Sequence, residues 1–296
     1  MKNVLTSTTT QIYQFNFSDK NKLKIISFFA SGLSGFFGAA GALFFNWIAQ
    51  FWLGRDMKEI NGLALFTISL SAIMSILARI LWQTHIIWIN WYVVSILFVS
   101  VACGAIGVVL GKRYEKRLKE KQLRWLFIGI LLFTGLRLLG FIPAMPLLLP
   151  INIWMTAGIW SLIAGISSPP LGMGAGVFLV PAFLTIGFNR DEGILMSLIV
   201  SAVLMLFGSW LFHKAKRLDV HDMRCVWLPA VLGAPVGVWV SYQISPAYFQ
   251  HLFGILLVVG ALKTLYDVNI YFRHLIKSFF SLYAYMKQHV LKFTAF

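Results

Sequence analysis

Long apolar runs separated by short polar stretches dominate the chain. Most runs have about 18 to 26 residues, which is the length that a helix needs to cross the hydrocarbon core of a bilayer. They lie at residues 23–53, 61–81, 86–111, 125–142, 151–188, 193–212, 225–244 and 247–266. The pattern predicts an all-α integral membrane protein with about eight hydrophobic segments.

Two of these runs, 23–53 and 151–188, are too long for one crossing, since about 20 residues suffice. Each holds a glycine-rich stretch: GLSGFFGAAGALFFN ends at Asn46, and GISSPPLGMGAGVFLVP ends at Pro181. In addition, Pro169 and Pro170 would break a helix at the middle of the second run. We therefore predict a broken or doubled-back first segment in each half of the chain.

The second half of the chain resembles the first. FIGILLFTGLRLL, which begins at Phe127, is echoed by LFGILLVVGALKTL from Leu252, and CGAIGVVLG from Cys103 is echoed by LGAPVGVWV from Leu232. With the glycine-rich stretches, three matches keep the same order and a similar offset; chance similarity among apolar helices is the alternative. The predicted divisions are a tail at 1–22, a first repeat at 23–142, a second repeat at 151–267 and an amphipathic tail at 268–296.

Composition indicates a membrane protein, and the distribution of charge predicts its orientation in the membrane. The chain is 59% hydrophobic and 12% charged, with a formal net charge of +15. Its basic residues gather in the amino-terminal tail and in loops 112–124 and 213–224, which the positive-inside rule places in the cytoplasm. Three single crossings between these loops would put them on opposite sides, so the 151–188 run must turn back. If the 23–53 run also turns back, each half crosses the membrane an odd number of times, and the two repeats are inverted. The prediction places the protein in the cell (inner) membrane with both termini in the cytoplasm.

The glycine-rich stretches are the candidate substrate site. Glycine permits unwound backbone, and the first turn of a resumed helix presents unpaired N–H groups and a partial positive charge to an oxyanion. The alternative is that these small residues only allow close helix packing. The candidate residues are Gly172, Gly174, Gly176, Ser167 and Ser168 in the second half, and Gly38, Gly41, Ser34 and Asn46 in the first.

Residues typical of enzymes or cofactor sites are missing from the apolar runs. No acidic residue lies in the middle of a predicted span, and no cluster of His, Asp and Glu suits a hydrolase or a metal centre. The sequence has no GxxxxGK[ST] phosphate-binding pattern, and Cys103 and Cys225 lack CxxC spacing. We expect no enzymatic activity, no cofactor and no metal, and the basic loops indicate orientation rather than a nucleic-acid partner.

One motif resembles that of a known family. GMGAGVFLVP, from Gly172 to Pro181, is similar to the GxGGGxxxxP signature of the TauE/SafE family of sulfite exporters and sulfonate permeases. In the first half, AAGALFFN keeps one of the clustered glycines and has Asn46 where the family pattern has proline. The resemblance extends over nearly the whole chain through the repeat. It implies a permease for sulfite, a sulfonate or a related small anion.

We therefore expect a secondary carrier for a small oxyanion that works by alternating access between two repeats. The competing hypothesis is a non-transporting membrane assembly or interaction protein, whose glycine motifs serve helix packing alone. The expected partners are the small anion and membrane lipid, and a homo-oligomer is compatible with this interpretation.

Overall fold

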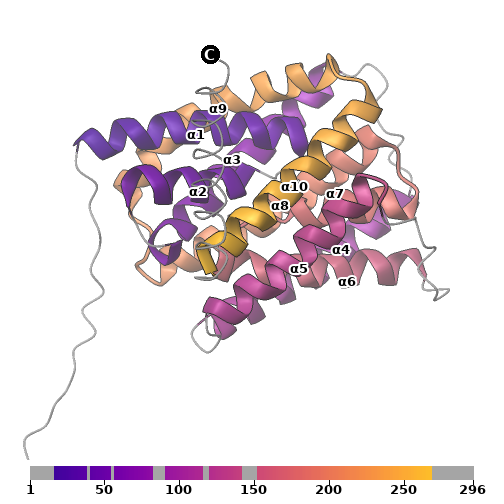
Figure 1. Ribbon diagram of the computed structural model, residues 1–296, viewed down its shortest axis with the longest axis horizontal. Helices are drawn as coiled ribbons and strands as arrows, with labels where there is room; N and C mark the ends of the chain where they lie inside the picture. Colours follow the sequence, from indigo (N-terminus) through magenta and orange to yellow (C-terminus); the bar gives the residue numbers. More distant parts are fainter. Residues whose placement is uncertain are drawn as a thin grey trace, which may run out of the picture. The chain divides into compact units, whose positions relative to one another are not determined.

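The computed structural model describes residues 17–38, 41–54, 57–82, 91–115, 120–141 and 152–268, which form ten α-helices (Figure 1). The helices are α1 (Phe17–Phe37), α2 (Gly41–Leu53), α3 (Met57–Trp82), α4 (Trp91–Tyr114), α5 (Glu120–Leu138), α6 (Ile153–Leu171), α7 (Gly176–Ile186), α8 (Arg190–Lys214), α9 (Val220–Tyr242) and α10 (Pro246–Val268). The described residues contain no strand, which confirms the all-helical prediction. The tails before residue 17 and after residue 268 lie outside the described residues.

Five of the ten helices in the described part of the chain are long and apolar enough to cross a membrane. They are Glu59–Trp82, Trp91–Tyr114, Arg190–Lys214, Val220–Tyr242 and Tyr248–Tyr266, within α3, α4, α8, α9 and α10. Exposed side chains along α4, α8 and α9 are often large and apolar, as at Phe98, Leu206 and Leu232. Such faces are suited to contact with lipid chains rather than water.

Each of the two overlong runs forms two helices. In the first, α1 ends at Phe37 and is followed by Gly38 with φ +79°, and α2 begins at Gly41. In the second, α6 ends at Leu171 and α7 begins at Gly176.

The second break lies later than the proline pair suggested. Pro169 and Pro170 are inside the last turn of α6, and the left-handed Gly172, with φ +58°, ends the helix. A proline removes its own N–H and crowds the carbonyl four residues earlier, which commonly kinks or breaks a helix, but Pro169 and Pro170 both lie within α6 here. A left-handed residue does end a helix, and glycine adopts that conformation without steric cost.

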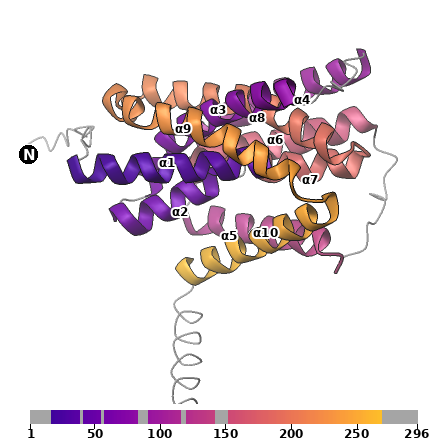
Figure 2. The same ribbon diagram turned by 90° about the horizontal axis from the view of Figure 1, so that it is seen from above.

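The helices of the larger unit, which comprises residues 1–118 and 143–250, pack in an exchanged pattern. The first helix of the second half, α6, lies along α4 of the first half, while α1 lies along α9 of the second half (Figure 2). The central helices α3 and α8 pack on each other. Each half therefore supplies the main packing partner for the broken segment of the other.

Glycine makes these two long contacts possible. A Cβ on Gly237 of α9 would overlap the Gly32 carbonyl oxygen of α1, and a Cβ on Gly111 of α4 would overlap the Ile166 carbonyl oxygen of α6. Backbones that approach this closely gain dispersion contacts that larger residues would prevent. The corresponding sequence stretches, around Cys103–Gly111 and Leu232–Val240, are those that repeat between the halves.

The second unit comprises residues 119–142 and 251–296. Its described helices, α5 and the greater part of α10, meet at Gly135 and Gly254. A Cβ on Gly135 would lie 2.8 Å from Val258 Cγ2, and one on Gly254 would lie 2.9 Å from Leu139 Cγ. Small residues thus set the approach of the helices in this unit as well.

Candidate functional site

Two asparagine side chains cap the carboxyl end of α6. Asn46 Nδ2 of α2 donates hydrogen bonds to the carbonyl oxygens of Leu171 and Gly172, at 3.0 and 2.8 Å. Asn61 Nδ2 of α3 donates to the carbonyls of Pro169 and Pro170, at 3.3 and 3.0 Å. Carbonyls at a helix end have no partner within the helix, and burying them without a donor is costly. The first half of the chain therefore satisfies the helix end of the second.

Gly172 fits between these two amides because it has no side chain. A Cβ there would overlap Asn61 Oδ1 and lie 2.6 Å from Asn46 Nδ2. Its φ of +58° independently disfavours other residues. Both requirements make Gly172 a structural necessity of the break.

The start of α7 presents backbone donors in a buried setting. Residues 171–180 are all buried, and Phe178 and Leu179 donate their N–H groups to the Ala175 carbonyl, each at 3.0 Å. The N–H groups of Gly174, Ala175, Gly176 and Val177 donate to no acceptor among the described residues. Unpaired N–H groups at the first turn of a helix, with the helix dipole behind them, are suited to an anion.

The break in the first half is held in the same crossed manner. Gly38 accepts a hydrogen bond from Ser197 Oγ of α8 at 3.4 Å, and a Cβ on Gly38 would lie 3.0 Å from side chains of Val180 and Ile194. The end of α1 thus lies against α7 and α8, as the end of α6 lies against α2 and α3. The structure brings both predicted glycine-rich stretches into contact with the opposite half.

The remaining predicted site residues are buried in or beside the broken segments. A Cβ on Gly41 would overlap the Ala30 carbonyl and lie 2.8 Å from Ser34 Cβ, so this glycine permits close packing of α2 on α1. Ser34 Oγ makes no hydrogen bond to a described residue. Ser168 Oγ donates to the Ala164 carbonyl of its own helix at 2.6 Å, and Ser167 is buried in the same turn.

Two residues of this region, Asn61 and Arg79, were not among the predicted site residues. An amide within an apolar run needs a hydrogen-bonding partner in the membrane, and this signal could have marked Asn61. Arg79, near the end of its run, resembled an ordinary interfacial arginine. In the structure it is 1% exposed and is the largest fully buried side chain among the described residues.

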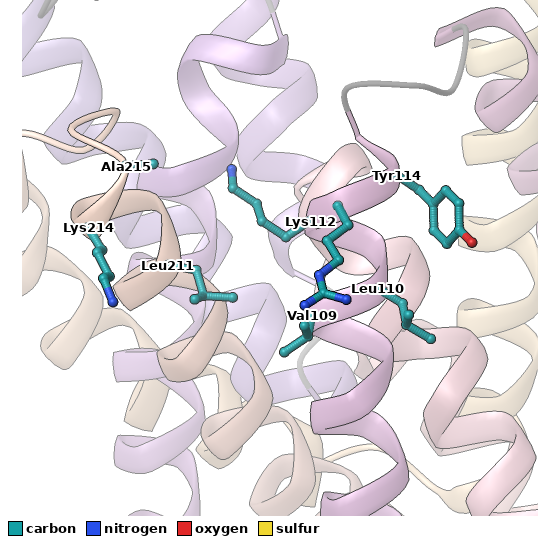
Figure 3. A pocket seen from close by; sticks show the side chains of 8 residues that line it. Val109, Leu110, Lys112, Tyr114, Leu211, Lys214 and Ala215 are labelled. Atoms are coloured by element: carbon teal, nitrogen blue, oxygen red, sulfur yellow. The ribbon is translucent and has the colours of Figure 1, made fainter.

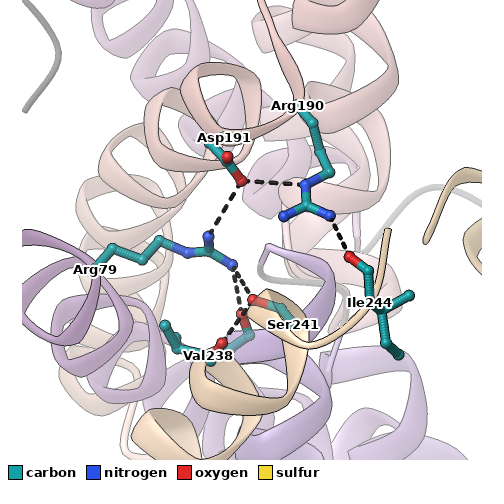
Figure 4. Close-up of polar contacts among 7 residues, drawn as sticks. Arg79, Arg190, Asp191, Val238, Ser241 and Ile244 are labelled. Carbon is teal, nitrogen blue, oxygen red and sulfur yellow. Dashed lines mark hydrogen bonds and ion pairs between the residues drawn. The ribbon is translucent and has the colours of Figure 1, made fainter. Parts of the chain in front are cut away.

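Arg79 links four helices at one end of the larger unit (Figure 4). Its Nη2 donates to the Gly35 carbonyl of α1 at 3.0 Å and to Ser241 Oγ of α9 at 3.2 Å. Its Nη1 lies 4.0 Å from Asp191 Oδ1 at the start of α8. Asp191 also accepts from Arg190 Nε at 3.1 Å. The guanidinium therefore ties α3 to the ends of α1, α9 and α8.

The described residues include no group of three or more His, Cys, Asp or Glu side chains placed to hold a metal ion. The polar groups of the breaks are amides, hydroxyls and backbone N–H groups. Such groups bind by hydrogen bonding, and they suit recognition of an oxyanion.

A family comparison decides the class of this protein. The model described as "Sulfite exporter TauE/SafE" matches residues 7–138 and 157–290, one stretch in each half of the chain. The chain belongs to the TauE/SafE sulfite exporter family. This confirms the resemblance seen at Gly172–Pro181. Searches of curated proteins and of solved structures gave no significant match.

Membership of TauE/SafE and the apolar helices together identify a multi-pass membrane transport protein. The two matched stretches correspond to α1–α5 and to most of α6–α10, and so agree with two repeats. The TauE/SafE motif itself, Gly172–Pro181, forms the break and the first half of α7.

Proposed function

We propose that this chain is a secondary carrier for a small oxyanion such as sulfite or an organosulfonate, and that the anion binds at the α6–α7 break. The observation that carries the proposal is the buried start of α7, where the N–H groups of residues 174–177 have no acceptor among the described residues. A bound oxyanion would supply those acceptors.

The electrostatics of the break favour a negative ligand. Two helix ends meet there, with the partial negative charge of the α6 carbonyls and the partial positive charge of the α7 N–H groups. Because Asn46 and Asn61 donate to the four carbonyls, the α6 end is already satisfied. The groups of the break that still lack partners are the N–H donors at the start of α7 and the acceptor oxygens Asn46 Oδ1 and Asn61 Oδ1, and an anion can bond only to the donors.

Alternating access between inverted repeats would open this site to the two sides of the membrane in turn. The exchanged packing of α1 on α9 and of α6 on α4 is the pattern that a two-fold axis between the halves would produce. If the axis lies in the membrane plane, rocking of one half against the other exposes a site between them to each side in turn. The proposed orientation has both basic loops and both termini in the cytoplasm.

A proteoliposome screen tests the substrate class. Purified protein would be reconstituted, and uptake of sulfite, sulfate, thiosulfate and simple sulfonates compared with protein-free liposomes. We expect saturable flux of at least one sulfur oxyanion. Monodisperse, correctly inserted protein that moves none of them would favour the assembly hypothesis. Packing glycines such as Gly41 and Gly237 give that hypothesis its structural support.

A further inference from the structure

A pocket between the carboxyl ends of α4 and α8 combines basic and apolar side chains (Figure 3). Its volume is about 810 Å³, and it is lined by Val109, Leu110, Lys112, Arg113, Tyr114, Leu211, Lys214 and Ala215. Three of these residues are cations, and none is acidic. In Figure 3, Lys112 extends from α4 and Lys214 from α8.

The neighbouring carboxylate offsets only part of this charge. Glu115 Oε2 accepts from Lys112 Nζ at 2.8 Å, and Glu115 Oε1 accepts from Arg217 Nη1 at 2.9 Å. With both oxygens engaged by cations, Glu115 is already paired. Arg113 and Lys214 are exposed and add two further positive charges at the pocket.

The surroundings resemble the boundary between lipid chains and headgroups. Trp210 and Tyr114 are 52% and 46% exposed, and Lys214 Nζ lies 5.3 Å from the centre of the Trp210 ring. Exposed tryptophan and tyrosine are enriched at this depth of a bilayer. One to two turns further into the helices, Ile106 and Leu206 present exposed apolar side chains.

An apolar groove adjoins the same end of α8. Its volume is about 530 Å³, and its lining includes Phe66, Leu206, Phe207, Trp210 and Met223. A ligand that is anionic at one end and apolar at the other could contact both the basic pocket and this surface. A free inorganic anion would use only the basic pocket.

We propose that the pocket between α4 and α8 binds the phosphate headgroup of an anionic phospholipid. Arg113 and Lys214 hold the phosphate by charge-assisted hydrogen bonds, and the acyl chains lie along the exposed apolar faces of α4 and α8. The inference rests on the membrane location of these helices and not on the identity of the transported anion.

Native mass spectrometry of protein taken from vesicles of phosphatidylglycerol and phosphatidylcholine tests this site. Wild-type protein is expected to retain phosphatidylglycerol in preference to phosphatidylcholine. The double variant Arg113→Gln/Lys214→Gln is expected to bind phosphatidylglycerol about 30-fold more weakly, since each cation near the surface contributes about fivefold. Lys24→Gln/Arg224→Gln is the matched control, because it removes two exposed charges that do not line the pocket.

Three results would overturn the proposal. The first is that Arg113→Gln/Lys214→Gln retains phosphatidylglycerol as wild type does. The second is that the control variant loses phosphatidylglycerol as much as the pocket variant does. The third is that inorganic phosphate displaces the lipid at millimolar concentration. The charge-preserving variant Arg113→Lys/Lys214→Arg should retain the lipid. It provides a second test if the glutamine variant fails to fold, because loss of the lipid from it would also contradict the proposal.

Discussion

At the scale of single residues, the break in α6–α7 depends on side chains far away in the sequence. Asn46 and Asn61 are more than 100 residues from the carbonyls that they cap. Their own oxygens, Oδ1 in both, are buried and accept no hydrogen bond from a described residue. Each amide therefore points its Nδ2 donor at the carbonyls that end α6. The reverse orientation would place the amide oxygen Oδ1 against those carbonyl oxygens.

Replacing Asn61 by leucine should destabilise the protein. The change leaves the carbonyls of Pro169 and Pro170 without a donor, at a cost of about 1 to 3 kcal/mol for each buried group. Thermal unfolding in detergent would show a lower midpoint. Asn152→Leu is the control, because Asn152 is exposed and makes no side-chain capping bond. Equal midpoints for the two variants would show that the cap contributes nothing.

Arg79 should matter more to stability than the acid beside it. Arg79→Met removes two hydrogen bonds from a charged donor, each worth about 1.5 to 3 kcal/mol. Asp191→Asn should cost less than about 1 kcal/mol, since the Asp191 side chain is 38% exposed and the ion pair is long. The same thermal assay measures both. A larger effect from Asp191→Asn would mean that the ion pair, not the hydrogen bonds, holds the four helices together.

At the scale of helices, sequence patterns predicted the elements well and their ends less well. The length of the apolar runs revealed that 23–53 and 151–188 must each be interrupted, because hydrocarbon thickness limits one crossing. The position of the second break was wrong by a few residues. Pro169 and Pro170 are strong signals in sequence, but the left-handed Gly172, held by two distant amides, sets the actual end of α6. Such tertiary capping has no local sequence signature. The amide of Asn61 within an apolar run could have marked it, whereas Arg79 near the end of its run resembled an interfacial arginine.

The close contacts of α1 with α9 and of α4 with α6 should be sensitive to a single methyl group. Gly237→Ala and Gly111→Ala each place a Cβ against a backbone carbonyl of the neighbouring helix, and overpacking of this kind costs about 1 to 3 kcal/mol. Gly129→Ala is the matched control, since a Cβ there meets no described atom within 4 Å. It should be neutral or raise stability, because alanine favours helix more than glycine. Similar midpoints for all three variants would refute glycine-mediated packing.

At the scale of the whole molecule, charged clusters lie at opposite ends of α8. Asp191 at its start belongs to the Arg79 cluster, and Lys214 at its end lines the basic pocket. The helix has 25 residues, and its length of about 37 Å exceeds the hydrocarbon core of a bilayer. If the apolar middle of α8 crosses the bilayer, both clusters lie near the headgroups at its two faces.

The proposed inversion of the repeats predicts that the two halves enter the membrane from opposite sides. In a background without Cys103 and Cys225, Asn21→Cys near the start of α1 and Asn152→Cys at the start of α6 would both be exposed to solvent. An impermeant thiol reagent applied to intact cells should label Asn152→Cys and leave Asn21→Cys unlabelled until the membrane is opened. Labelling of both positions from the same side would contradict inversion.

The most direct test of the central claim is sulfite flux through Gly174→Val protein in proteoliposomes. If the N–H groups at the start of α7 bind the anion, a side chain at Gly174 blocks their approach. We then expect flux to be lost, and sulfite to stop raising the thermal midpoint of protein that is still folded. Gly129→Val should keep both the flux and the rise in midpoint. Wild-type flux in Gly174→Val would contradict the account, because the break would then not be the site of transport.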